Sequence, residues 1–331
     1  MAGEAGGQEA TGGTPASQAL AVAARLRGKI PAARRDTLPR TLLNRRMDGT
    51  ACLAPPVSVA HPPRQTVPLV FASPHSGRDY PPDFLAASRL DPLGLRRSED
   101  SFVDLLFADA PAHGAPLLTA GFPRAWCDAN REAWELDPGM FDEPLPPFVN
   151  TSSPRVGAGL GTIPRLVASG EPIYAGRLRF AEAEARIRGC WEPYHETLAA
   201  LISATCARFG ACLLIDCHSM PSGLAAGPDM VLGDAHGSAC APAITRFVEQ
   251  ALRAQGHVVR RNDPYSGGFI TRHYGRPRRR VHVLQLELAR GLYMNEARIE
   301  MLPRFAAVRA EMAGLIGQLA AAAPELLADR G

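Results

Sequence analysis

Two stretches of the chain share one pattern, in which a short apolar run reaches a histidine flanked by small residues and a proline. They are residues 67–77, which end in His75-Ser-Gly, and residues 211–221, which end in His218-Ser-Met-Pro. Continuous apolar runs bounded by turn residues are typical of buried strands in an α/β sheet. Ligands of such sheets bind at the carboxyl ends of the strands. Two imidazoles at that edge therefore favour a metal site.

A lone histidine after a strand is more often a hydrogen-bonded structural residue than a metal ligand, and this alternative holds for each of the nine histidines. The pair, rather than either residue alone, favours metal binding. Asp216 adds to this interpretation, because it lies two residues before His218 and so on the same face of the strand. A carboxylate in that position can orient the imidazole of a metal ligand.

Composition bounds the class of protein. With 331 residues, 46% of them apolar, the chain can bury a large core as one α/β domain or two smaller ones. Its net charge of +3 is too small to indicate a nucleic-acid or membrane partner. The seven cysteines lack CxxC spacing, which is typical of reduced thiols. No stretch approaches the ~20 consecutive apolar residues of a membrane span, so we expect a cytoplasmic protein.

The chain divides unevenly. Residues 1–60, rich in Gly, Ala, Pro and Arg, predict a flexible or loosely docked extension with a short helix over 15–27, and residues 61–331 predict a single domain. Within that domain we expect helices from Ser98 onward, over 173–209 with an interruption near 189–193, over 244–255 and over 298–322, and strands over 229–234 and 281–289. Residues 137–164 predict a long loop, which in a compact domain is usually functional.

Arginines and an asparagine outside the histidine motifs are candidates for binding an anionic ligand. Arg124, Asn130 and Arg131 follow an apolar segment, and Arg272 lies in a glycine-punctuated stretch over 262–275. An arginine can grip a carboxylate through two parallel hydrogen bonds. The plainer alternatives are surface arginines and, for residues 262–275, an ordinary hairpin turn.

The predicted strand over 281–289 alternates in a way that places Gln285 and Glu287 on one face. A carboxylate late on that face is costly to bury unless it has a partner or a task. At a zinc site the task is to take a proton from water and to hand it to the leaving group. A salt-bridged structural glutamate is the alternative, because ion pairs also occupy such places.

Together these segments resemble the N-formylglutamate amidohydrolases, a family of zinc hydrolases related to the carboxypeptidase and aspartoacylase group. The resemblance runs from about Val70 to Met294. Its motifs are Ser-Pro-His75-Ser-Gly, Glu99-Asp100, Asp128-Ala-Asn130-Arg131, Asp216-Cys-His218-Ser, residues 267–275 and Leu-Gln-Leu-Glu287. Each motif alone is weak, but their common order and spacing are specific.

The resemblance implies a three-layer α/β/α sandwich with a mixed central sheet, as in zinc carboxypeptidases (the phosphorylase/hydrolase-like fold), with residues 61–331 as one catalytic domain. It also implies one Zn²⁺ ion, with other divalent metals as alternatives, and a role for each candidate residue. The metal ligands would be His75, Asp100 and His218, and Glu287 would act first as general base and then as general acid. Arg124 would polarise the scissile carbonyl. Asn130 and Arg131 would bind the substrate carboxylate, and Arg272 would bind a second carboxylate.

The chain departs from the carboxypeptidase and aspartoacylase pattern at one metal ligand. That pattern supplies a carboxylate three residues after the first histidine, where this chain has Arg78. The third ligand must therefore come from elsewhere. By its match to the family we expect Asp100, with the adjacent Glu99 as the alternative and Asp104 as an outer partner.

The implied activity is hydrolysis of an N-acyl acidic amino acid, with N-formyl-L-glutamate as the first candidate, formate and L-glutamate as products, and histidine degradation as the setting. One alternative is the same zinc chemistry on another N-acyl amino acid or a small peptide. A second is a non-catalytic protein that binds a dicarboxylate on the same fold. The combination of His75, His218 and Glu287 argues against the second, because a sensor needs no base. The sequence does not indicate an oligomeric state.

Overall fold

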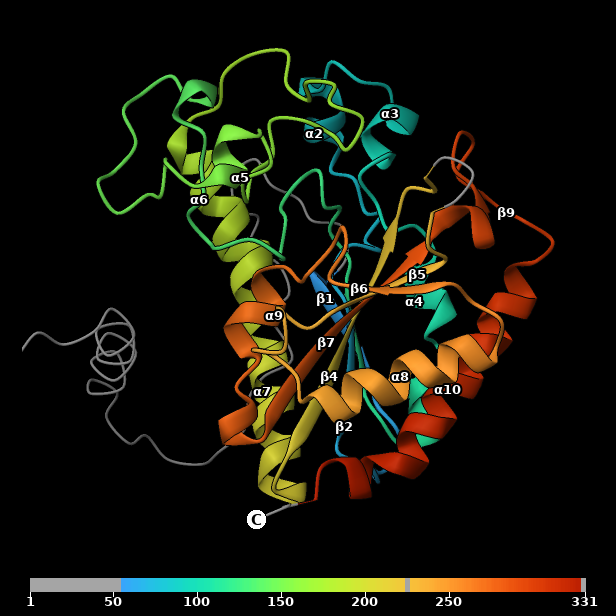
Figure 1. Cartoon of the computed structure of the whole chain (residues 1–331). Helices are drawn as coiled ribbons and strands as arrows, with labels where there is room; N and C mark the ends of the chain where they lie inside the picture. The colour runs from blue at the N-terminus through green and yellow to red at the C-terminus, as the bar shows by residue number, and fades with distance from the viewer. Residues whose placement is uncertain (1–54, 224–226, 329–331) are drawn as a thin grey trace, which may run out of the picture. The chain divides into compact units, whose positions relative to one another are not determined.

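The computed structural model describes residues 55–223 and 227–328, all within the unit Met47–Gly331. At its centre a seven-stranded sheet has the order β1-β3-β2-β4-β7-β5-β6 (Figure 1). The strands are β1 (Val57–Ala60), β2 (Leu69–Ser73), β3 (Leu117–Ala120), β4 (Cys212–Met220), β5 (Met230–Gly233), β6 (Val259–Arg261) and β7 (Val281–Ala289). The pairs β1·β3 and β5·β7 are antiparallel and the other pairs are parallel, so the sheet is mixed.

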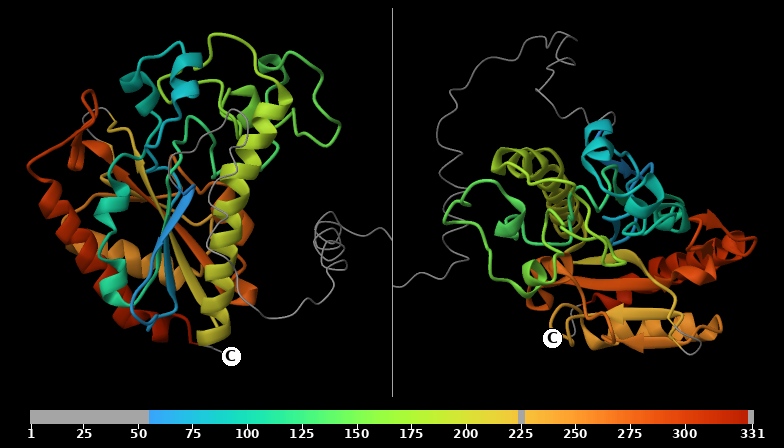
Figure 2. Two further views of the ribbon diagram at one scale, coloured as in Figure 1. Left: turned by 180° about the vertical axis from the view of Figure 1, so that it is seen from behind. Right: turned by 90° about the horizontal axis from the view of Figure 1, so that it is seen from above.

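Helices cover both faces of this sheet. The α-helices are α2 (Pro82–Ala87), α3 (Pro92–Arg96), α4 (Val103–Leu106), α5 (Pro154–Gly157), α6 (Phe180–Arg186), α7 (Glu192–Phe209), α8 (Pro242–Ala254), α9 (Phe269–Tyr274) and α10 (Phe305–Leu326). Short 3₁₀-helices are η2 (Ala110–His113), η3 (Pro138–Met140), η5 (Pro277–Arg279) and η6 (Arg290–Leu292), and η4 (Ile187–Trp191) is a π-turn. Outside the main sheet, β8 (Met294–Asn295) pairs with β9 (Glu300–Met301). Helices α4, α8 and α10 pack on one face and α7 on the other (Figure 2). The predicted α/β fold with three layers and a mixed sheet is confirmed; a specific likeness to carboxypeptidases stays a prediction.

The alternation of side chains along β4 separates two cores. Leu213 and Ile215 point into the core shared with α4, α8 and α10, whereas Leu214 points into the core under α7. Each fully buried leucine of this kind contributes about 1.5–3 kcal/mol through removal of apolar surface from water. On the α7 face the apolar residues give way to Asp216 and His218 toward the carboxyl end of the strand. The polar site therefore lies on this face, at the strand ends.

The segment before α4 differs from the prediction. A helix from Ser98 was expected, but α4 begins only at Val103, and Phe102 before it has a left-handed backbone with φ of 69°. The reason is tertiary, because the backbone N–H of Asp100 donates to the carbonyl of His75 at 3.0 Å instead of to a preceding helical turn. This hydrogen bond places Asp100 beside the first histidine.

Other boundaries also shift. The helix expected over 173–209 starts at Phe180. At the predicted interruption the helical turns continue but widen into the π-turn η4. Pro193 follows this turn and has no N–H to donate. The closing helix starts at Phe305 rather than 298, and residues 262–275 contain α9. The strands over 229–234 and 281–289 are confirmed as β5 and β7.

The predicted amino-terminal extension falls mostly outside the described residues, as does the predicted helix over 15–27. Residues 57–60, in the range predicted for the extension, form β1 and pair with β3. Among residues 55–223 and 227–328, no helix combines the length and the apolar character that crossing a bilayer requires.

Candidate active site

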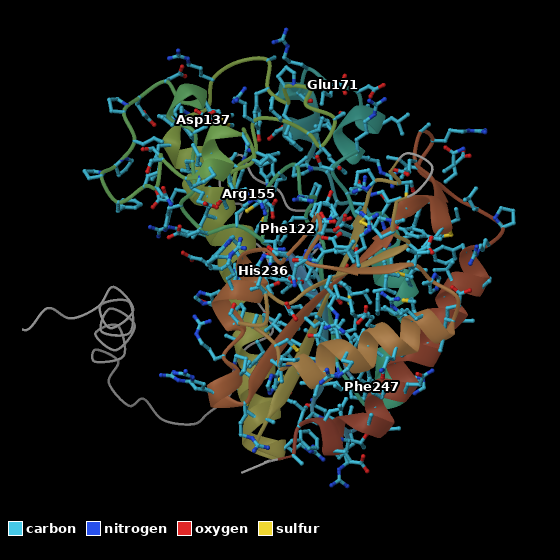
Figure 3. All side chains as sticks on the ribbon, in the orientation of Figure 1. Phe122, Asp137, Arg155, Glu171, His236 and Phe247 are labelled. Carbon is cyan, nitrogen blue, oxygen red and sulfur yellow. The ribbon has the colours of Figure 1, made fainter. Side chains whose placement is uncertain are left out.

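A cavity of about 290 Å³ opens at the carboxyl ends of the central strands. Segments far apart in the sequence deliver its walls, and among these residues Figure 3 labels Arg155. Its polar lining includes His75, Asp100, Arg124, Asp128, Asn130, Arg131, Arg155, His218, Ser219, Gln285, Glu287 and Arg290. All predicted site residues except Arg272 line this cavity.

His75, Asp100 and His218 form a buried group whose ligand atoms all lie within 4.8 Å of one another. Oδ2 of Asp100 lies 3.3 Å from Nδ1 of His75 and 3.0 Å from Nδ1 of His218. In the described part of the chain this is the one group of three such residues placed to hold a metal ion. Three protein ligands leave a coordination position open for water or substrate, as a catalytic zinc site requires.

The other polar atoms of these three residues also lie close to polar partners. Nε2 of His75 lies 2.8 Å from Oδ1 of Asp128, and Nε2 of His218 lies 3.0 Å from Oδ2 of Asp216. Oδ1 of Asp100 accepts hydrogen bonds from Ser219 Oγ at 3.1 Å and from the guanidinium of Arg290 at 3.2 Å. Carboxylates behind ligating imidazoles are the usual outer partners of a metal site. The group therefore fits a divalent cation.

The alternative carboxylates lie elsewhere. The Glu99 side chain is buried, accepts from Arg96 Nε at 3.0 Å and Ser101 Oγ at 2.8 Å, and faces a second cavity. Asp104 pairs with Arg78 at 2.9 Å near the surface. The geometry therefore favours Asp100 over Glu99.

Two buried carboxylates of the site remain ionised. Burial alone would raise the pKa of Asp100, but hydrogen bonds from His218 and His75 hold it well below its usual range. Burial alone would likewise raise the pKa of Asp128, but the charges of Arg131 and Arg124 hold the pKa of that carboxyl well below its usual range. Negative charge is thus fixed around the point where the two imidazoles meet.

Glu287 lies beside this group because β7 pairs with β4 in a register that makes Glu287 the direct partner of His218. The carboxylate is 6% exposed, and Gln285 Nε2 donates to its Oε1 at 2.7 Å. Burial raises the pKa of Glu287 to about 7, against the attraction of His218. A base with a pKa near neutrality is suited to proton transfer.

Gln285 also holds the loop on the other side of the cavity. Its Oε1 accepts from the backbone N–H of Gly268 at 2.9 Å. A side chain at Gly268 would not fit, because its Cβ would lie 2.3 Å from the amide of Asn130. The alternation predicted for 281–289 placed Gln285 on the face of Glu287, but no sequence pattern indicated this second contact.

Arg124 and Arg131 share one carboxylate. Arg124 Nε donates to Oδ2 of Asp128 at 2.9 Å, and Arg131 Nη2 lies 3.6 Å from the same oxygen. Arg131 also donates to the carbonyls of Leu160 and Asn130, and burial lowers its pKa to about 10, so that it stays cationic at neutral pH. Both arginines are held in place at the cavity wall.

Arg272 does not lie where the sequence suggested. Residues 269–274 form α9 instead of a loop tip, and exposed Arg272 folds back so that its Nη1 donates to the carbonyl of Gly267 at 2.8 Å. The part of this segment that lines the cavity is 264–268. The structure therefore does not bring Arg272 to the other candidate residues.

The match to a family model decides the family. Residues 67–294 match the model of the N-formylglutamate amidohydrolases. The chain belongs to the N-formylglutamate amidohydrolase family. This confirms the resemblance carried by the sequence motifs.

Curated relatives and a solved structure agree with the family. The chain is 33% identical over 244 residues to an N-formylglutamate deformylase of Pseudomonas aeruginosa, covering 70% of this chain and 84% of the relative. It is 30% identical over 238 residues to one of Pseudomonas putida, covering 70% and 83%. The crystal structure of an N-formylglutamate amidohydrolase from Ralstonia eutropha JMP134 superposes with a TM-score of 0.78 at 35% identity, covering 82% of this chain and 99% of that one.

Replacing Asp216 with Asn tests the support behind His218 in this family member. The Asp216 side chain is fully buried 3.0 Å from Nε2 of the imidazole, so the change removes its charge with little change in volume. We expect zinc affinity, measured by competition with a chelator, to fall about 10- to 100-fold. Asp109→Asn, which affects only a surface pair with Arg309, is the control. Unchanged affinity in Asp216→Asn would argue against this role.

Proposed function

We propose that the chain is a metal-dependent amidohydrolase that converts N-formyl-L-glutamate into formate and L-glutamate. The observation that carries the proposal is the convergence of His75, Asp100 and His218 beside Glu287 in one polar cavity. The names of the two Pseudomonas relatives, both N-formylglutamate deformylases, support the substrate. Action in the cytoplasm and a place in histidine degradation stay predictions.

We propose one Zn²⁺ ion as the cofactor, held by His75, Asp100 and His218, with other divalent metals as alternatives. When bound, such a cation lowers the pKa of a water molecule toward ~7 and polarises a carbonyl group. Asp128, hydrogen-bonded to His75, and Asp216, whose buried carboxylate lies 3.0 Å from Nε2 of His218, support this assignment, because carboxylates behind ligating imidazoles are usual at metal sites.

The side chains of the cavity account for the rest of the reaction. Glu287 accepts a proton from the attacking water and delivers it to the amide nitrogen as the C–N bond breaks, which frees the amino group of glutamate. The cationic Arg124 at the cavity wall stabilises the negative charge that develops on the formyl oxygen. Asn130 and Arg131 bind the α-carboxylate of the substrate.

The pH dependence should follow the base. Glu287 acts only when deprotonated, and its pKa of about 7 lies above the 4.5 of an ordinary glutamate. We therefore expect kcat/KM to fall as the pH is lowered through an acidic limb above 4.5. The measurement is a pH profile with zinc content recorded at each point. A profile flat from pH 5 to 8 at constant zinc content would contradict this assignment.

The substrate is tested by comparison. Zinc-loaded protein should hydrolyse N-formyl-L-glutamate with a higher kcat/KM than N-formyl-L-aspartate or N-acetyl-L-aspartate. A preference for either of the others would favour the alternative of a different N-acyl amino acid. Binding of a dicarboxylate without turnover of any of them would favour the non-catalytic alternative.

A further inference from the structure

Four arginines line the cavity, and three of them are paired. Arg290 donates to Asp100, and Arg124 and Arg131 share Asp128. For the guanidinium of Arg155, the structure gives no hydrogen bond and no ion pair with any of residues 55–223 and 227–328. One cation at the cavity wall is therefore left without an acceptor from the described part of the chain.

The backbone of Arg155 is fixed relative to Arg131 through a single residue. Leu160 donates its N–H to the carbonyl of Arg155 at 2.8 Å, and its own carbonyl accepts from Arg131 Nε at 2.8 Å. At the start of α5, Ser153 Oγ accepts from the N–H of Val156 at 3.1 Å. The short helix thus has a defined position relative to Arg131, and Arg155 is labelled in Figure 3.

Arg131 and Arg155 are close enough to repel each other electrostatically. After burial, the charges of Arg124 and then Arg155 lower the pKa of Arg131, and the charges of Asp128 and Glu135 oppose them. Arg124, Arg131 and Arg155 are three guanidinium groups against these two carboxylates, and such an excess favours an anionic ligand, because each group can form charge-assisted hydrogen bonds to its oxygens.

We propose that Arg155 binds the side-chain carboxylate of the substrate and thereby selects N-formyl amino acids with an acidic side chain. This inference rests on the proposed function, in which Asn130 and Arg131 bind the α-carboxylate. A substrate held there presents its second carboxylate to the adjacent cation that has no acceptor. Arg155 takes the place that the sequence suggested for Arg272: both are exposed, but Arg155 lines the cavity, whereas Arg272 does not and is bound to Gly267.

The test compares two substrates of equal shape, N-formyl-L-glutamate and N-formyl-L-glutamine, in zinc-loaded full-length protein. In Arg155→Gln, kcat/KM for the glutamate substrate should fall about 10- to 100-fold, the range for a hydrogen bond to a charged group, with little change for the glutamine substrate. Arg155→Lys should retain part of the preference. The matched control is Arg165→Gln, on the same loop but paired with Asp137 and outside the cavity lining.

An equal fall for both substrates would overturn the proposal, because Arg155 would then act on a group that both share. Unchanged kinetics in Arg155→Gln would also overturn it and show a solvated surface arginine. Calorimetric binding of glutarate and of its monoamide separates this inference from the proposed function. If the unchanged protein hydrolyses neither substrate, the proposed function fails. The role of Arg155 in binding a carboxylate is then still supported if Arg155→Gln loses the preference for glutarate over its monoamide. It is overturned if that preference persists.

Discussion

Replacing Glu287 with Gln is expected to remove most turnover of N-formyl-L-glutamate and to leave the metal bound. Glutamine has nearly the same volume and leaves the β4–β7 ladder intact, but it cannot accept the proton of the attacking water. Loss of a general base typically lowers the rate 10²- to 10⁴-fold, and we expect a fall in kcat of about that size. The measurement is kcat together with zinc content by elemental analysis.

The control for this variant is Glu300→Gln, which changes an exposed glutamate of β9 by the same chemistry. It should keep the kcat of the unchanged protein. Turnover near that of the unchanged protein in Glu287→Gln, at full zinc content, would exclude Glu287 as the base. Loss of zinc in this variant would instead indicate that Glu287 is a metal ligand.

Asp100→Asn is the second change from which we expect a large effect, here on metal binding. Oδ2 of Asp100 lies between the two Nδ1 atoms, and an amide in its place offers a neutral, weaker ligand. Zinc affinity should fall by more than the about 10- to 100-fold typical of outer partners, and activity should fall with it. The measurement removes the metal from both proteins with a chelator and then adds zinc back. The protein without the substitution should regain activity at a zinc concentration that does not reactivate Asp100→Asn.

Glu99→Gln discriminates between the two adjacent carboxylates that the sequence offered as ligands. Glu99 is bound to Arg96 and Ser101 and faces away from the histidines, so this variant should keep one zinc per chain. The reverse result, with zinc retained in Asp100→Asn and lost in Glu99→Gln, would assign the ligand to Glu99.

The strands that carry the site could be predicted because they are buried on both faces. Short apolar runs bounded by turn residues, such as those before His75 and His218, are typical of such strands. Asp100 could be named from the family motif although its local structure was predicted wrongly. The motif preserves the identity of a residue, whereas its conformation depends on a hydrogen bond to His75 that no local pattern encodes.

The residues that sequence reasoning missed act through long-range contacts. Asp128 meets His75 across 53 positions, and Arg290 meets Asp100 across 190. Both had a signal in the sequence, since Asp128 opens the motif that contains Asn130 and Arg290 directly follows the strand that carries Glu287, but neither signal indicated the partner. For Arg155 the signal stopped at the loop over 137–164, because no local pattern distinguishes one residue of that Pro- and Gly-rich stretch.

The register of β4 against β7 limits how this protein can change in length. Because His218 and Glu287 are ladder partners, one residue inserted ahead of either within its strand turns that side chain to the opposite face, into the apolar core that contains Leu213 and Leu284. An insertion in the loops over 137–164 leaves the register of these two strands unchanged. Insertions and deletions in relatives should therefore gather in those loops, while the two strands keep their lengths.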